Sequence, residues 1–550
     1  MKYILKRMVL VAFGLMFAQM AWAETTTTGA VVPDAPTIIS TSSTADHSQF
    51  EALKGPFASG PEVTKACLSC HTEADNQLMH SIHFNWSYDS ESGQSLGKSK
   101  VINAFCGNVA GNEPRCTSCH AGYGWDDMSK TPQQANVAPD CLVCHDRSGQ
   151  YTKSATGAGH PPLDPVKPGT KTITGALAWA VDLPKSAQSV GMPGRDNCGN
   201  CHFYGGGGDN VKHGDLSSAL YNPTPEVDVH MSPDGANFTC ATCHVEDKHN
   251  WAGSRYDTVV QETGLRQPGA GRTTATCESC HSDAPHPLTI KGVKLNDHTD
   301  KLACQSCHIP EFARGGVATK TYWDWSAAGR MGPDGKPMHE DNWVQSDGKK
   351  LHTYLSTKGI FDYGEDVVPH YAWFDGHVEY ATDEVIDPTQ VVEVNRLGGT
   401  PGATDSRIWP FKRMKGRQAY DTASMKLTYS QVWGPTTDTA FWTNFDWAKA
   451  IEAGMKAAGR DYSGQFDFTD TYMYWPITHM VAPAEQALDC VACHAEDGRL
   501  EGIDNVYLPG TDPKGPFALI GMVVLALAVL GVIGHTLLRV IGRKQGGISS

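Results

Sequence analysis

The chain has 550 residues, of which 40% are hydrophobic and 19% are charged, and its formal net charge is −15. This length and composition allow a large folded core, and the acidic balance argues against nucleic acid as a partner while favouring contact with basic proteins. The sequence contains no phosphate-binding loop, no dinucleotide fingerprint and no Ser-His-Asp arrangement. Nucleotide-dependent enzymes and serine hydrolases are therefore excluded.

Residues 1–23 have the pattern of a secretory signal peptide. A basic start is followed by an apolar stretch over residues 8–20 and by the small-residue sequence Ala21-Trp22-Ala23. The apolar stretch is too short to span a bilayer, so we expect cleavage before Glu24 and export of the rest. Residues 24–60 are rich in Thr, Ser, Ala and Pro and are predicted to form a flexible leader.

A pentapeptide, Cys-x-x-Cys-His, occurs eight times along the chain. This is the attachment motif for c-type haem, in which two thiols bond the porphyrin and the adjacent His ligates the iron. The sequence therefore predicts eight covalently attached c-type haems. The copies are Cys67-Cys70-His71, Cys116-Cys119-His120, Cys141-Cys144-His145, Cys198-Cys201-His202, Cys240-Cys243-His244, Cys277-Cys280-His281, Cys304-Cys307-His308 and Cys490-Cys493-His494.

Seven of the eight motifs fall within residues 61–308, which leaves little protein between them for an ordinary core. The porphyrins themselves must supply much of the buried surface, and they must lie close enough for electrons to pass between them. We expect a mainly α fold with much irregular structure, organised around the eight haems, with short helices at the motifs and Gly/Pro-rich loops between them.

Residues 309–489 carry no haem motif and hold nine of the fourteen tryptophans. They are interpreted as a haem-poor subdomain in which the tryptophans serve mainly for packing. One helix is predicted, with Asp446 as N-cap, residues 447–458 as its body and Gly459 as its stop. Residues 490–515 then carry the eighth motif and a short tether.

Residues 516–538 are apolar and small over a length that can cross a membrane as a helix. The alternative is a helix buried in a protein core. The tail, residues 539–550, contains Arg539, Arg543 and Lys544, which predicts a cytoplasmic C-terminus. The sequence thus predicts a single-pass protein of the bacterial inner membrane with its haem domain in the periplasm.

The second axial ligand decides the role of each haem, because a His there gives a saturated electron carrier while an open position admits substrate. Fifteen histidines lie outside the motifs, so counting alone does not reveal whether one haem is left for catalysis. For each candidate the alternative is a surface or hydrogen-bonding His. The candidates are His83, His160, His213, His230, His249, His286, His298 and His479.

Cys106 is the one cysteine outside the motifs, and it lies ten residues before Cys116. It has no intramolecular disulfide partner left, because every other cysteine belongs to a haem motif. The alternatives are a buried inert thiol and a functional thiol beside the second haem.

The eight motifs, the stretch Asn103-Ala-Phe-Cys106 and the stretch beginning Asp182-Leu-Pro-Lys185 together resemble the octahaem tetrathionate reductase family over roughly residues 60–500. That family is distantly related to hydroxylamine oxidoreductase and the multihaem nitrite reductases. The resemblance implies that the second haem is catalytic, with His120 as proximal and Lys185 as distal ligand. It also implies that Asn103, Cys106 and Asp182 line the pocket. Lys153 is the competing lysine.

These features predict a reductase that passes electrons to a small anionic or nitrogen-oxide substrate, namely tetrathionate, nitrite or hydroxylamine. The C-terminal helix departs from the soluble members of the family and favours a quinol-linked membrane donor, with a cytochrome partner as the alternative. Two other functions stay open: a hydroxylamine-oxidising enzyme, and an electron conduit with every haem ligated by two histidines.

Overall fold

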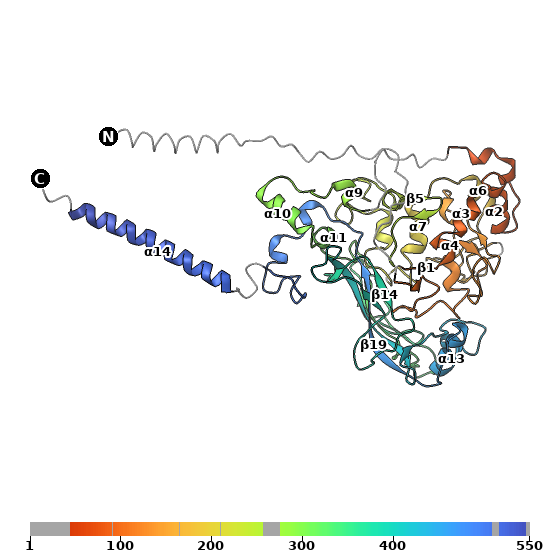
Figure 1. Cartoon of the computed structure of the whole chain (residues 1–550). Coiled ribbons are helices and arrows are strands. Elements are labelled where there is room, and N and C mark those ends of the chain that lie inside the picture. The colour runs from red at the N-terminus through yellow and green to blue at the C-terminus, as the bar shows by residue number, and fades with distance from the viewer. Residues whose placement is uncertain are drawn as a thin grey trace.

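The computed structural model describes residues 44–90, 92–163, 166–209, 211–256, 276–508 and 516–545. The predicted signal peptide and the first part of the predicted leader lie outside these residues. The described chain forms a body in which a part with short helices lies against a β-sheet, and one long helix extends from the body (Figure 1).

Each of the eight motifs lies on, or at the end of, a short helical segment, as predicted. A helical turn brings two cysteines three residues apart onto one face, where both can reach one porphyrin. The segments are α2 (Gly60–Leu68), η3 (Cys116–Cys119), α5 (Leu142–His145), α7 (Arg195–His202), α8 (Cys240–Cys243), α9 (Glu278–His281), α11 (Gln305–His308) and η6 (Cys490–Ala492).

Irregular chain, four further short helices and small hairpins connect the motifs. The helices are α3 (Ala74–Met79), α4 (Ile82–Asn85), α6 (Leu183–Gln188) and α10 (Ile290–His298), with 3-10 turns at η4 (Ser218–Tyr221) and η5 (Ala484–Gln486). The paired strands are β1 (Tyr88–Asp89) with β2 (Ser95–Leu96), β3 (Gly122–Tyr123) with β4 (Ala138–Pro139), and β5 (Glu246–Asp247) with β6 (Asn250–Trp251).

The predicted leader ends earlier than residue 60. Two 3-10 turns, η1 (His47–Gln49) and η2 (Glu51–Leu53), precede the first motif. Leu53 is buried in a cluster with Val63 and Leu142, so the hydrophobic effect holds the segment that contains η2 against the haem-binding part. The Thr, Ser, Ala and Pro content of residues 24–60 predicts a flexible leader and does not reveal that Leu53 is buried.

The predicted mainly α character is wrong for residues 319–476, which form a nine-stranded sheet. The longest strands, β17 (Arg407–Asp421) and β19 (Phe466–Pro476), pair antiparallel over eleven residue pairs. In β19, every second side chain from Thr469 to Trp475 is buried, a period of two that is typical of strands. Seven strands lie in the order β15 (Val392–Glu393), β19, β17, β7 (Thr319–Asp324), β12 (Gly359–Gly364), β11 (Tyr354–Leu355) and β8 (His339–Glu340).

Two more strands, β13 (His370–Phe374) and β18 (Lys426–Leu427), pair with β17. Separate two-stranded pairs are β9 (Trp343–Val344) with β10 (Lys350–Leu351) and β14 (Val378–Tyr380) with β16 (Asn395–Leu397). Near the sheet lies α13 (Trp447–Ala457), preceded by the short α12 (Phe441–Asn444). The Asp446 carboxylate caps α13 by accepting a hydrogen bond from Lys449 N, which confirms the predicted helix and its N-cap.

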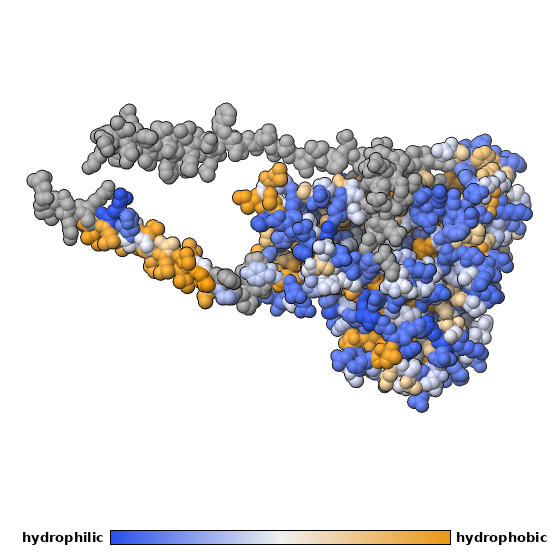
Figure 2. All heavy atoms as spheres, viewed as in Figure 1, coloured by the Kyte–Doolittle hydropathy of each residue, from blue (hydrophilic) through white to orange (hydrophobic). Residues whose placement is uncertain are grey.

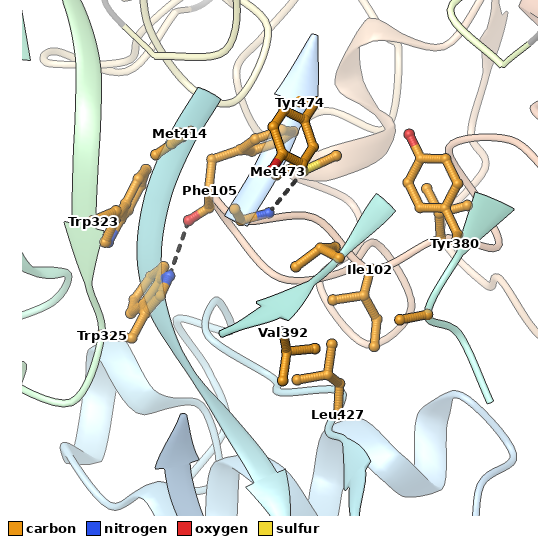
Figure 3. Close-up of a cluster of buried hydrophobic side chains, with 14 of the residues drawn as sticks. Ile102, Phe105, Trp323, Trp325, Tyr380, Val392, Met414, Leu427, Met473 and Tyr474 are labelled. Atoms are coloured by element: carbon orange, nitrogen blue, oxygen red, sulfur yellow. Dashed lines mark hydrogen bonds between the residues drawn. The ribbon is translucent and has the colours of Figure 1, made fainter. Parts of the chain in front are cut away.

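The sheet supplies a core into which a haem-region segment, residues 101–106, inserts (Figure 3). Trp325 Nε1 donates to Phe105 O at 3.1 Å, and Gln418 Nε2 donates to Asn103 O at 2.9 Å. Ala104 N contacts Met473 Sδ at 3.2 Å. The three contacts come from residues in or next to three different strands. The haem-poor part of the chain therefore positions residues 101–106, which precede the second motif.

The long helix α14 (Pro516–Gln545) extends away from the body (Figure 1). Its residues Leu519–Ile541 are long and apolar enough to cross a membrane, and their side chains are not buried. The apolar band is visible in Figure 2 as a continuous orange stretch. This agrees with the predicted apolar segment and disagrees with the alternative of a helix in a protein core.

Candidate functional site

A single connected cavity of about 2500 Å³ runs through the haem-binding part. It is several times larger than an ordinary ligand pocket, for which about 300–1,000 Å³ is typical. Cysteines of the first seven motifs line it. The cavity therefore has the size and the chemical lining required for a row of covalently attached porphyrins.

The cysteine side chains show the order in which the motifs adjoin. Side chains from different motifs are in hydrogen-bonding contact at four places: Cys67 with Cys141, Cys119 with Cys201, Cys198 with Cys240, and Cys277 with Cys304. Three further pairs lie close to each other: Cys144 with Cys198, Cys243 with Cys277, and Cys307 with Cys493. Numbered in chain order, the motifs thus form one row: one, three, four, five, six, seven and eight. The second motif lies beside the fourth.

Seven motif histidines each face a histidine from elsewhere in the chain. Ring centroids in these pairs are 6.0–6.4 Å apart, which leaves room for one metal between two imidazoles at bonds of about 2 Å. The pairs are His71 with His47, His145 with His249, His202 with His83, His244 with His479, His281 with His230, His308 with His286, and His494 with His298.

Six of the eight candidate second ligands therefore lie opposite a motif histidine. His160 instead packs beside Tyr123, with ring centroids 5.5 Å apart, and the buried His213 lies beside Asp215. Neither ring is among the seven pairs, because proximity to a motif in the sequence does not fix which way a loop turns. The prediction missed His47, which lay in the supposed leader; its position twenty residues before Cys67 was the available signal.

Two of the paired motif histidines have Nδ1 bonded to a backbone carbonyl. His145 Nδ1 lies 2.9 Å from Gly191 O, and His244 Nδ1 lies 2.9 Å from Ala252 O. A metal-bound imidazole is oriented in the same way, with its second nitrogen donating to a carbonyl or carboxylate. Nε2 of each ring is left for a metal.

His120, of the second motif, is oriented the opposite way. Its ring is fully buried against Phe84, Trp86 and Trp125, with centroids 5.0, 5.3 and 4.8 Å away. Its Nε2 lies 2.5 Å from Phe84 O, while Nδ1 has no partner. Burial lowers the pKa of His120 to about 3, so the ring is neutral and Nε2–H donates to the carbonyl. Nε2 of His120 is therefore engaged away from the cavity, and the proximal role of His120 stays a prediction.

A lysine contacts the second motif from within the protein. Lys153 is fully buried, its Nζ donates to His120 O, and it pairs with Asp140 Oδ2 at 2.9 Å. Tyr123 and Tyr151 donate to the same carboxylate at 2.6 and 2.8 Å. Lys153 is thus held in one place by a hydrogen-bonded buried ion pair.

Lys185 and Asp182 do not take the places predicted for them. Both are exposed on α6, where Asp182 Oδ1 accepts from Lys185 N at 2.9 Å as the helix cap. Neither residue lines the cavity. The Asp-Leu-Pro-Lys spacing is explained by helix capping, and the competing lysine, Lys153, is the one beside the second motif.

Cys106 and Asn103 do line the cavity next to Cys116. Asn103 Oδ1 accepts from Phe105 N at 3.1 Å and from Cys106 N at 2.8 Å, which closes a tight turn. Cys106 Sγ lies 3.5 Å from Gly206 O. Asn103 therefore shapes the loop that presents the thiol.

Basic side chains line the same cavity as this thiol, namely Lys98, Arg115, Lys212 and Arg255. Burial lowers the pKa of Lys212 well below its usual value, and the neighbouring charges of Arg255 and Lys98 act in the same direction. Like charges held together in a low-dielectric wall favour an anion between them.

Three comparisons with known proteins bear on these observations. The family model described as bacterial cytochrome c matches residues 320–497. An uncharacterized protein of Archaeoglobus fulgidus is 24% identical over 261 residues, which cover 40% of this chain and 84% of the relative. The crystal structure of octahaem cytochrome c from Shewanella oneidensis is 38% identical in sequence and matches with a TM-score of 0.70, covering 86% of this chain and 99% of that chain.

The chain belongs to the octahaem cytochrome c family. This confirms the family predicted from the motifs, and c-type haem is the cofactor of the octahaem cytochrome. The cavity fits it, since cysteines of seven motifs line it and the paired histidines face each other at the spacing that one iron needs. When bound, the haems supply electron transfer, and the protein supplies their ligands, order and surroundings.

The His47–His71 pair can be tested by substitution. We expect His47→Ala to convert about one-eighth of the haem in the octahaem cytochrome from low-spin to high-spin, since one of the eight motifs loses its facing imidazole. Electron paramagnetic resonance of the oxidised protein measures this. The control is His80→Ala, which removes an exposed histidine bonded to Asn76 O. An unchanged spectrum in His47→Ala would show that His47 is not a ligand.

Proposed function

We propose that this octahaem cytochrome is a multi-electron reductase whose catalytic centre is the second motif. The observation that carries this proposal is that seven motif histidines face another histidine while His120 is turned into an aromatic cluster. Two histidine ligands saturate an iron and limit it to electron transfer, whereas a centre without them has a position for substrate. An electron conduit with two histidines at every haem is not favoured by this arrangement.

The order of the motifs supports a branch that ends at the second motif. The contact between Cys119 and Cys201 joins the second motif to the fourth, and the fourth adjoins both the third and the fifth. Electrons that enter at either end of the row reach the fourth motif before the second. A substrate at the second centre is thus supplied from two directions, which suits a reaction that needs several electrons.

We propose Lys153, in place of Lys185, as the lysine that acts at the second centre. Its Nζ lies against the backbone of the second motif, where the His120 ring is absent. When haem is bound, the Lys153 amine would hold one side of the iron and leave the other to substrate, and the Asp140 carboxylate, 2.9 Å from Nζ, would fix its position.

The residues around Cys106 favour a small anion as substrate. Lys98, Arg115 and Arg255 supply positive charge inside the cavity, where the low dielectric strengthens their attraction for an anion. Lys320 and Lys358 lie near Cys106 from the side of the sheet; burial lowers the pKa of both lysines, and the Cys106 thiol acts in the opposite direction. Tetrathionate and nitrite are both small anions, and hydroxylamine is a neutral alternative.

Tetrathionate gives Cys106 a direct role. Its thiolate attacks a central sulfur, a new sulfur–sulfur bond forms to Cys106, and one thiosulfate leaves with the electron pair of the broken bond. Two electrons from the haem row then cleave the new bond, which releases the second thiosulfate and restores the thiolate. Reduction of nitrite or hydroxylamine consumes protons as well as electrons and does not require this thiol.

We also propose that the haem domain is exported and tethered to the inner membrane. The apolar span Leu519–Ile541 supports the tether, and the basic residues after it support a cytoplasmic tail. A tethered cytochrome favours a quinol-linked membrane donor over a freely diffusing cytochrome, because both partners then share one surface.

Lysine substitution tests the assignment of the second centre. We expect Lys153→Arg to lower dye-linked turnover of tetrathionate, nitrite and hydroxylamine at least about 100-fold, an effect of the size seen for a catalytic group. Arginine keeps the charge and the pairing with Asp140, but its guanidinium stays protonated and offers no ligand. Steady-state rates with a reduced dye, on protein carrying all eight haems, measure the loss.

Lys185→Arg is the matched control and should keep activity within about twofold, because Lys185 is exposed on α6. If Lys185→Arg abolishes turnover while Lys153→Arg does not, the centre is assigned to the wrong lysine. If both variants keep full activity, a lysine does not act at the second centre.

Cys106→Ser separates the two kinds of substrate. We expect it to abolish tetrathionate turnover and to leave nitrite and hydroxylamine turnover within about threefold, since a hydroxyl does not exchange sulfur–sulfur bonds. The same dye-linked assay on the three substrates measures this. Equal loss with all three substrates would contradict the thiol mechanism, and full tetrathionate activity would rule it out.

A further inference from the structure

We infer that Asp215 lowers the reduction potential of the haem held between His244 and His479, the fifth in the chain, by placing a buried carboxylate against one of its ligands. The inference rests on the pairing of these two histidines as ligands. It does not depend on which substrate is reduced or on which lysine acts at the second centre.

The Asp215 side chain is almost fully buried, with 1% of the residue exposed, and it borders the cavity. Its Oδ2 lies 3.0 Å from His479 Nδ1 and also accepts from the backbone nitrogens of Thr478 at 2.9 Å and His479 at 3.2 Å. These three contacts fix the carboxylate against the ring. The His479 ring in turn stacks on His244 with centroids 6.2 Å apart and planes 28° apart.

Other paired histidines have uncharged acceptors at the same nitrogen. The acceptors are Gly191 O on His145 at 2.9 Å, Ala252 O on His244 at 2.9 Å, Gln77 Oε1 on His249 at 3.1 Å, Asn296 Oδ1 on His286 at 2.9 Å and Lys294 O on His298 at 2.6 Å. The carboxylate on His479 therefore sets the fifth haem apart from these neighbours.

The charge of Asp215 is not cancelled by a direct partner. In the described part of the chain, no lysine or arginine forms an ion pair with it, and its Oδ1 has no hydrogen-bond partner. His213 Nδ1 lies 3.9 Å from that oxygen. The charge of Asp215 also acts on Lys212 and Lys412, whose pKa values burial lowers; Lys412 Nζ is bonded to Val211 O, Lys212 O and Thr319 Oγ1.

The direction of the effect follows from electrostatics. A carboxylate that accepts from a ligand imidazole makes the ring a stronger donor, and its negative charge stabilises the more positive, oxidised iron. Burial strengthens both effects because water does not screen them. The fifth haem is therefore harder to reduce than a haem between two histidines with neutral acceptors.

The place of this haem in the row gives the low potential a role. Cys240 of the fifth motif adjoins Cys198 of the fourth, and Cys243 lies near Cys277 of the sixth. Motifs six to eight thus reach the second centre only through the fifth. Electrons that enter at motif eight must therefore pass a haem of low potential. They stay on the haems of motifs six to eight until the electron donor is reducing enough to reduce the fifth haem.

Asp215→Asn tests the inference, since asparagine keeps the shape and an acceptor oxygen but removes the charge. In a redox titration of the full-length, haem-loaded protein followed by visible absorbance, we expect one haem in eight to shift to a higher potential. The other seven should stay where they are. The low-spin resonance of the oxidised protein should persist, which shows that His479 still ligates.

Asn296→Asp is the matched reverse variant, because it puts a carboxylate on His286, the partner of His308. We expect it to shift one haem, the seventh, to a lower potential. It also keeps the inference testable if Asp215→Asn does not accumulate with all its haems. Unchanged potentials in a folded Asp215→Asn, or an unchanged or raised potential in Asn296→Asp, would overturn the inference. Loss of dye-linked turnover together with the expected shift in potential would concern the proposed function and would leave the inference standing.

Discussion

The arrangement of this protein depends on one constraint, the placing of two imidazoles on opposite sides of an iron at a fixed separation. Seven histidine pairs meet it with centroids 6.0–6.4 Å apart. In five of the seven pairs the second histidine comes from a segment more than thirty residues away, such as His479 opposite His244. The chain must fold back repeatedly to meet this constraint, which explains short helices and irregular connections in place of long regular elements.

The second motif does not have a facing pair of imidazoles. Other side chains surround it, and the sheet holds some of them in place. His120 is turned into an aromatic cluster, while Lys153 and Asp140 form a buried pair beside the motif. Strand residues Trp325 and Gln418 hold the turn that carries Cys106. A rigid sheet is suited to holding such a loop, since its backbone hydrogen bonds fix positions that loops leave free. The haem-poor part of the chain thus acts as support for the candidate active site.

The sequence predicted local chemistry better than long-range arrangement. The eight motifs, the helix capped by Asp446 and the apolar C-terminal segment each depend on neighbouring residues, and their patterns are visible in the chain. The partner of each motif histidine depends on folding across long distances, so His160 was favoured where His47 lies opposite a motif. Likewise, Lys185 is predicted from the residues next to it in the sequence, but Lys185 is exposed and Lys153 is buried. Burial is not visible in the sequence. The sheet is hard to predict because β19 buries Thr469 and Thr471 along with Met473 and Trp475, so its buried face is not marked by hydrophobic residues alone.

The central claim is that seven irons carry two histidines and one does not. It is tested most directly by quantifying the spin states of the oxidised, haem-loaded protein by electron paramagnetic resonance together with Mössbauer spectroscopy. The account predicts seven low-spin irons with two imidazole ligands and one iron with a distinct signal that changes when nitrite is added. Eight irons with the two-imidazole signature, none of them altered by nitrite, would contradict it.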